Sequence, residues 1–111
     1  MSGDNQIDIP QSFMALFVSP GRSTPNAAQE VVIARYERCE DMASTLIELA
    51  QALAFKENFA ETEVLARCHQ GLLATPAAFT AGEAMWVIAR LAELLAWDPP
   101  QFQTPSKETT S

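Results

Sequence analysis

The stretch from Pro25 to about Phe55 constrains the fold of this chain most, because no further glycine or proline interrupts it. Alanine, leucine, glutamate and glutamine dominate the stretch, and these residues favour an α-helix. Apolar residues recur along it in alternating steps of four and three: Val32, Tyr36, Cys39, Ala43, Leu46, Ala50 and Leu53. We therefore predict a long central helix that packs along one side and spans about 45 Å.

Four further apolar residues widen this stripe: Ile33, Met42, Ile47 and Leu49. More than one helix must therefore pack on it.

Turn signals predict where the central helix and a shorter helix before it begin. Thr24 can cap the central helix, with Pro25 at its first position. Asp8 and Gln11 form a capping-box pattern, with a proline suited to the first turn between them. This pattern predicts a short apolar helix over 13–18.

Two more helices are predicted after the central one. The first covers about 62–73 and turns four apolar residues inward: Val64, Leu65, Cys68 and Leu72. The second covers 81–97, opens with a capping box of Thr80 and Glu83, and ends where two prolines follow Asp98. The predicted fold class is all-α: one small helical bundle over 1–97, followed by an extended or disordered tail over 98–111.

Acidic residues outnumber basic ones, with 14 aspartates and glutamates against 7 lysines and arginines among 111 residues, a net charge of −7. This balance argues against nucleic acid as a partner, since phosphate contacts need clustered cations. No apolar run approaches the roughly 18–20 residues of a membrane span, and the acidic N-terminus does not resemble a secretory signal. We therefore expect a cytoplasmic protein without a membrane partner, whose two cysteines stay reduced.

The two cysteines and the one histidine, Cys39, Cys68 and His69, are the first candidates for chemistry. A structural zinc site needs four ligands, usually paired at short spacing, and these three residues lack that pattern. Both cysteines lie in apolar stripes, where a free cysteine acts as a small hydrophobic residue. We predict buried, unreactive thiols, with a zinc site or a Cys–His nucleophile as alternatives.

Several carboxylates share one face of the predicted central helix: Glu37, Glu40, Asp41 and Glu48. Mg²⁺ and Ca²⁺ prefer such oxygen ligands, but one straight helix cannot surround an ion. We predict a solvated face, partly paired with Arg35 and Arg38, and no cofactor.

The turn ahead of the central helix is the candidate for anion binding. Free backbone N–H groups, two hydroxyls and a guanidinium could hold an anion there through Arg22, Ser23 and Thr24. Arg35 or Arg38 would add a second cation. A plain turn with a helix cap is the alternative. Because the chain has no G-x4-G-K-[ST] phosphate loop, we expect neither tight ATP binding nor hydrolysis, and we predict no catalytic residues.

The last predicted helix carries two stripes. One stripe is a core face: Ala84, Ile88, Leu91 and Leu95. The opposite stripe holds the candidate interface residues: Trp86, Arg90, Glu93 and Trp97. Two tryptophans are costly to leave in water, so something must cover them. The candidates are the chain's own aromatic and leucine residues at 13, 16, 17 or 102, a second copy in a homodimer, or another protein.

The chain resembles a known protein family over most of 12–97. Five segments carry this resemblance: 12–17, 20–22, 35–43, 65–72 and 86–95. Together they resemble a family of small proteobacterial proteins whose members are sometimes labelled "ATPase with chaperone activity". The resemblance implies a protein that could accompany an ATP-dependent chaperone, and it implies no site residues.

We expect a non-enzymatic helical interaction or adaptor protein that acts through a surface. Its partner would be another protein or a second copy of the chain. The alternative is a small-ligand or anion-binding protein that uses the turn over 19–24 and Arg22. An enzyme comes third, since four helices can enclose a cofactor but too few polar residues converge.

Overall fold

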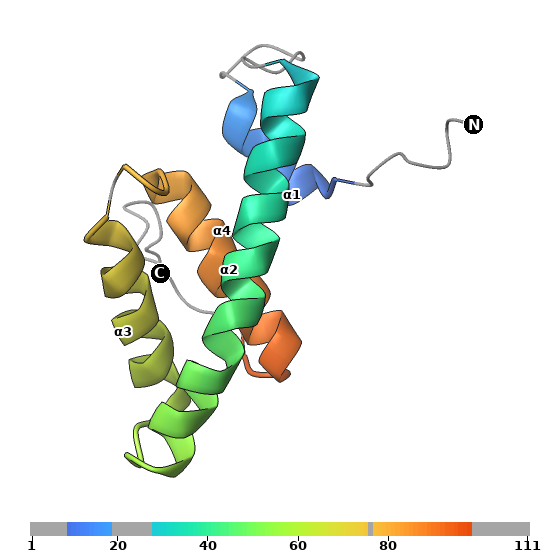
Figure 1. Ribbon diagram of the computed structural model, residues 1–111. Coiled ribbons are helices and arrows are strands. Elements are labelled where there is room, and N and C mark those ends of the chain that lie inside the picture. Colours follow the sequence, from blue (N-terminus) through green and yellow to red (C-terminus); the bar gives the residue numbers. More distant parts are fainter. Residues whose placement is uncertain (1–8, 19–27, 76, 99–111) are drawn as a thin grey trace, which may run out of the picture.

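The computed structural model describes residues 9–18, 28–75 and 77–98, and every element in these ranges is helical (Figure 1). The elements are α1 (Gln11–Met14), the 3₁₀ turn η2 (Ala15–Phe17), α2 (Gln29–Phe55), α3 (Glu61–Leu73) and α4 (Ala81–Leu95). The prediction of an all-α fold with one long helix, a short N-terminal helix and two further helices is confirmed. In these ranges, no helix is both long and apolar enough to cross a membrane.

α2 forms the long axis of the arrangement, and the other helices pack around it (Figure 1). α3 runs antiparallel to the C-terminal half of α2, and α4 packs against both of them. The short α1 reaches α4, and it touches the N-terminal half of α2 through Phe13 and Tyr36. Three helices thus enclose one core, with α1 added at one side.

The start of α2 differs from the prediction. The helix begins at Gln29, four residues later than Pro25. Its N-cap residue is Ala28, whose side chain forms no capping hydrogen bond. Thr24 and Pro25 lie outside the described residues. The 27 residues of α2 span about 40 Å.

The N-terminal helix is shorter than predicted. Its α-helical part covers only Gln11–Met14, after which the chain tightens into η2 and becomes extended at Val18. Pro10 is the N-cap rather than a first-turn residue, and no side chain caps the helix. Asp8, the expected capping residue, lies outside the described residues.

α3 and α4 follow their predicted limits closely. α3 begins one residue before Thr62, after a turn in which Asn58 takes the left-handed conformation (φ 65°). α4 begins with the predicted capping box, in which the Glu83 N–H donates to Thr80 Oγ1 at 3.1 Å. It ends two residues earlier than predicted because Ala96 is left-handed (φ 61°). Beyond Asp98, the predicted tail lies outside the described residues.

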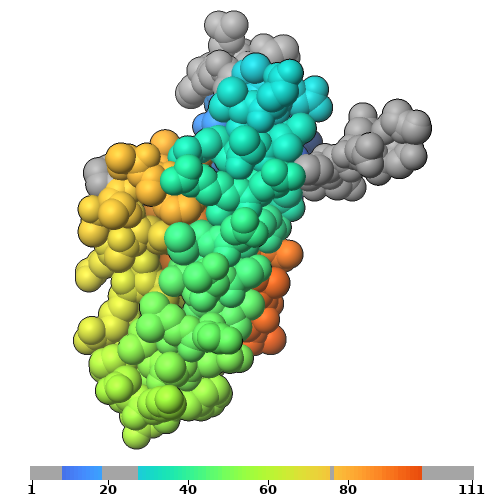
Figure 2. Space-filling model, in the orientation of Figure 1, coloured from blue at the N-terminus to red at the C-terminus, as the bar shows by residue number. Residues whose placement is uncertain are grey.

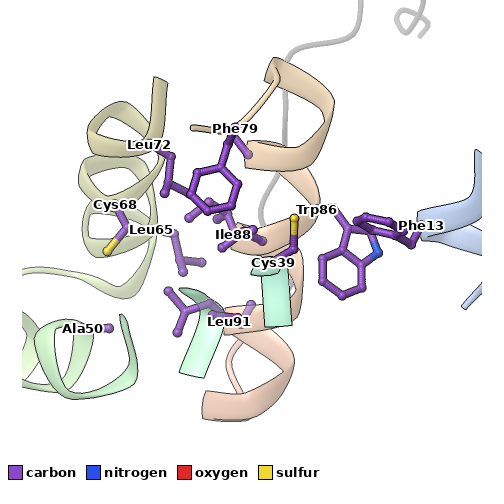
Figure 3. Packing of buried hydrophobic residues seen from close by; sticks show 14 of the residues in the cluster. Phe13, Cys39, Ala50, Leu65, Cys68, Leu72, Phe79, Trp86, Ile88 and Leu91 are labelled. Atoms are coloured by element: carbon purple, nitrogen blue, oxygen red, sulfur yellow. The ribbon is translucent and has the colours of Figure 1, made fainter. Parts of the chain in front are cut away.

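The core lies where α2, α3 and α4 meet (Figure 3). From the predicted stripe of α2, four residues are buried: Val32, Cys39, Ala43 and Ala50. The other three are partly buried: Tyr36, Leu46 and Leu53. All four inward residues predicted for α3 are buried, as are three of the four predicted for α4, with Leu95 partly buried. Three of the buried α2 residues are small, which lets neighbouring helices approach closely.

Candidate functional site

Arg35, a predicted anion ligand, is bound by the buried Glu83. Its Nε donates to Glu83 Oε2 at 2.8 Å, a second N–H donates to Glu83 Oε1, and the same nitrogen reaches the Ala78 carbonyl at 3.0 Å. The side-chain hydrogen bond to Glu83 raises the pKa of Arg35. This guanidinium is therefore committed to an ion pair with Glu83, and no described contact favours the anion-binding alternative.

Glu83 is almost fully buried, with 2 % of its surface exposed. Burial alone would raise the pKa of its carboxyl group, but hydrogen bonds from Arg35 and the Thr80 N–H, together with the positive charges of Arg35 and Arg38, outweigh burial and leave the pKa below its ordinary value. The carboxylate thus stays ionised while it joins α2 to the first turn of α4.

Among the other predicted anion ligands, Arg38 is the one that the structure describes. Arg22, Ser23 and Thr24 lie outside the described residues. Arg38 is exposed, and its guanidinium carbon lies 5.4 Å from the centre of the Phe79 ring. Arg38 remains a surface cation beside an aromatic ring.

Trp86 is covered by the chain itself. Its indole N–H donates to Ser12 Oγ at 2.9 Å, and its ring centre lies 5.1 Å from that of Phe13 in an edge-to-face arrangement (Figure 3). Tyr36 of α2 completes the cluster, with its ring centre 5.7 Å from Trp86. Of the alternatives, the N-terminal helix supplies the cover for this tryptophan, through Phe13.

The other predicted interface residues lie nearer the surface. Arg90 pairs with Glu40 at 3.2 Å and with Glu93 at 2.9 Å, and the Tyr36 hydroxyl donates to Glu40 at 2.8 Å. Glu40 therefore points toward α4 and does not belong to the solvated face that was predicted for it. Trp86, Arg90 and Glu93 together line a cavity of about 310 Å³, and Trp97 packs partly buried against the core.

The thiols behave as the sequence predicts, since Cys39 and Cys68 are free and buried. Burial raises the pKa of Cys68 and, as the largest cause, raises that of Cys39 to about 12. Both groups are thus protonated at neutral pH, where a thiol is a poor nucleophile. Within the described ranges, no three histidine, cysteine or acidic side chains gather as metal ligands would.

A groove between α2 and α3 is the feature that the sequence analysis missed. It encloses about 370 Å³ on the face where the two helices lie side by side (Figure 2). Four residues of α2 line one wall: Met42, Leu46, Leu49 and Leu53. Arg67 and Gly71 of α3 line the other wall, and Phe79 of the following loop also borders it.

The packing expected on the widened stripe of α2 is incomplete. Ile47 packs against the core, but Leu49 keeps 49 % of its surface exposed because neither α3 nor α4 covers it. The apolar surface of α2 is wider than its neighbours cover, and this width was the signal in the sequence that could have predicted the groove.

Comparison with models of protein families, with curated proteins and with solved structures finds no match to this chain.

Proposed function

We propose that this chain is a non-enzymatic helical interaction protein, an adaptor that binds another protein in the groove between α2 and α3. The observation that carries the proposal is the incompletely covered apolar wall of α2, in which Leu49 keeps 49 % of its surface exposed and Met42, Leu46 and Leu53 are only partly buried. Amphipathic helices commonly bind in such grooves through apolar side chains spaced one turn apart.

The groove supplies anchor positions of the required kind. Leu49 is half exposed in its wall, and a leucine-sized side chain gains about 1.5–3 kcal/mol when it is fully buried. Met42 gives the same wall an adaptable, unbranched side chain, which suits a binding surface. A partner that covers this wall would thus gain most of its affinity from apolar burial.

The face that carries Trp86 and Trp97 offers less to a partner. Trp86 is 9 % exposed and hydrogen-bonded to Ser12, so a partner would have to displace α1 to reach its indole. Arg90 and Glu93 there form a surface ion pair that suits the polar rim of an interface. The family resemblance points to a chaperone as one class of partner for the groove.

Site-specific photo-crosslinking in the source organism tests the proposal. A photoreactive residue at position 49 should yield a discrete crosslinked partner, because Leu49 lines the groove. The matched control places the same residue at Glu48, which is exposed and points about 100° away on the same helix. Loss of the product at position 49, or equal products from both positions, would reject the groove as the interaction site.

A further inference from the structure

The N-terminal segment over 9–18 lies against the three-helix core as a short peptide lies against its binding protein. Phe13 is its anchor: the ring is fully buried, and its centre lies 5.4 Å from that of Tyr36 of α2 and 5.1 Å from that of Trp86 of α4 (Figure 3). Ser12 precedes this anchor and accepts the indole N–H of Trp86 at 2.9 Å. One aromatic ring with an adjoining hydrogen bond thus attaches the segment to both helices.

Two further anchors follow Phe13 at helical spacing. Leu16, three residues on, approaches Gly82 of α4 so closely that a Cβ atom there would lie 3.1 Å from Leu16 Cδ2. Phe17, four residues on, keeps its ring centre 5.4 Å from that of Phe13 and packs against the core. Peptide helices that bind in grooves use anchors at this spacing, i, i+3 and i+4. The surface that receives these anchors is named the α2–α4 seat and consists of Tyr36, Gly82 and Trp86.

The segment is held less firmly than the helices that form its seat. α1 has 4 residues and η2 has 3, and no side chain caps the start of α1. Helices this short are not stable by themselves, so the segment is ordered only while it is bound to the core. α2, α3 and α4 bury apolar side chains against one another without its help. Release of the segment should therefore be a local opening that costs less free energy than global unfolding.

The segment also leaves part of its site empty. A cavity of about 310 Å³ lies beside it, with Pro10 and Ser12 on the side of the segment and α2 and α4 on the other. The rings of Tyr36 and Trp86 and the methyl group of Ala89 give this cavity apolar lining. A ligand that kept the three anchors and carried a longer side chain than Pro10 three residues before the first anchor would fill space that this chain's own segment leaves open.

We propose that the segment over 9–18 is an internal ligand of the α2–α4 seat, and that a helix of another protein displaces it. The displacing helix carries an aromatic residue at i, leucine at i+3, an aromatic residue at i+4 and a long apolar side chain at i−3. A second copy of the chain does not fit as well, because its segment is identical and lacks the high effective concentration of the tethered one. This site is separate from the groove between α2 and α3 and goes beyond the proposed function.

Binding of synthetic peptides to the full chain tests the proposal. A peptide with the sequence of residues 9–18 should bind the Phe13→Ser chain more than about tenfold more tightly than the wild-type chain, whose seat is filled. Pro10→Leu in the peptide should tighten binding to the Phe13→Ser chain by about threefold, because leucine enters the cavity. Phe13→Ala in the peptide should abolish binding. Leu49→Ser, added to the Phe13→Ser chain, is the matched control and should leave the affinity unchanged, since Leu49 lines the other groove.

Native-state hydrogen exchange on the wild-type chain tests the release of the segment. The N–H groups of Phe13 and Met14 both donate to the Pro10 carbonyl at 3.0 Å, so their exchange reports the opening of α1. These two amides should exchange faster than the amides at the centre of α4. Their exchange should also depend less on denaturant, because a local opening exposes less surface than global unfolding.

Equal affinity of the peptide for the wild-type and Phe13→Ser chains would overturn the proposal, as would a Pro10→Leu peptide that binds no more tightly. Loss of cooperative unfolding in the Phe13→Ser chain, or exchange of α1 and α4 in one common step, would show that the segment is part of the core. A wild-type dimer in light scattering that Phe13→Ser dissociates would assign the seat to the segment of a second copy and also reject the proposal. The crosslink at position 49 reports on the groove alone, so the proposed function stands or fails separately.

Discussion

At the scale of single residues, Glu83 performs two tasks with one carboxylate. It accepts the Thr80 N–H at 3.0 Å, which closes the capping box of α4, and it holds Arg35 of α2 across 48 positions of sequence. The acid is buried while Arg35 keeps 26 % of its side chain exposed, so the pair is partly solvated on one side only. Such a pair is costly to break from the buried side.

Replacement of Glu83 by glutamine should lower the free energy of unfolding by about 2–3 kcal/mol, because it leaves the Arg35 guanidinium without its counter-charge. Urea denaturation measures the effect. Glu93→Gln is the control, since Glu93 is an exposed partner of Arg90 and its loss should cost less than about 1 kcal/mol. Equal losses in the two variants would show that the buried pair is no stronger than the surface one.

The same carboxylate should make stability depend on pH. Its pKa in the folded chain lies below the ordinary 4.5, so its stabilisation is fully present above that pH and is lost as the pH falls through the lower folded value. The difference in unfolding free energy between the wild type and Glu83→Gln should therefore be constant from neutral pH to about 5 and shrink below about 4.5. A difference that stays constant down to pH 3 would contradict this assignment.

At the scale of elements, features set by neighbouring residues were predictable from the sequence. The capping box of Thr80 and Glu83 and the limits of α3 depend on local geometry, and both agree with the structure. The partner of Arg35 was not predictable, because Glu83 reaches it only after α2 and α4 have packed. The groove was missed for the same reason: it depends on how α3 packs beside α2, and the apolar width of α2 alone cannot distinguish a covered wall from an open one.

Gly71 and Gly82 provide a test of helical glycine in two surroundings. Gly71→Ala should raise the free energy of unfolding by about 0.5–1 kcal/mol, because the new Cβ meets nothing within 4 Å. Gly82→Ala should gain less, since its Cβ would lie 3.1 Å from Leu16 Cδ2 and that side chain would have to move. Thermal unfolding of both variants measures the difference. Destabilisation by Gly71→Ala would indicate that the position is occupied within the chain.

At the scale of the whole molecule, the N-terminal segment depends on the three-helix core for its order. α1 has 4 residues and η2 has 3, too few to be stable as isolated helix in water. The completely buried Phe13 ring meets Trp86 of α4 and Tyr36 of α2, and Ser12 adds the hydrogen bond to the indole. Packing in this aromatic cluster thus holds α1 against the core, and Trp86 lies at the centre of the cluster.

Trp86→Ala should therefore destabilise the folded chain and leave its oligomeric state unchanged. We expect a loss of about 3 kcal/mol, since the substitution removes a buried indole and the partner of Ser12 and Phe13 together. Trp97→Ala should cost less, because Trp97 is only partly buried. Light scattering should give the monomer mass for the wild type and for both variants, while denaturation measures the two losses. A wild-type dimer that Trp86→Ala converts into a folded monomer would instead establish this face of α4 as a twofold interface. If Trp86 only held α1 in place, its removal would not alter subunit association.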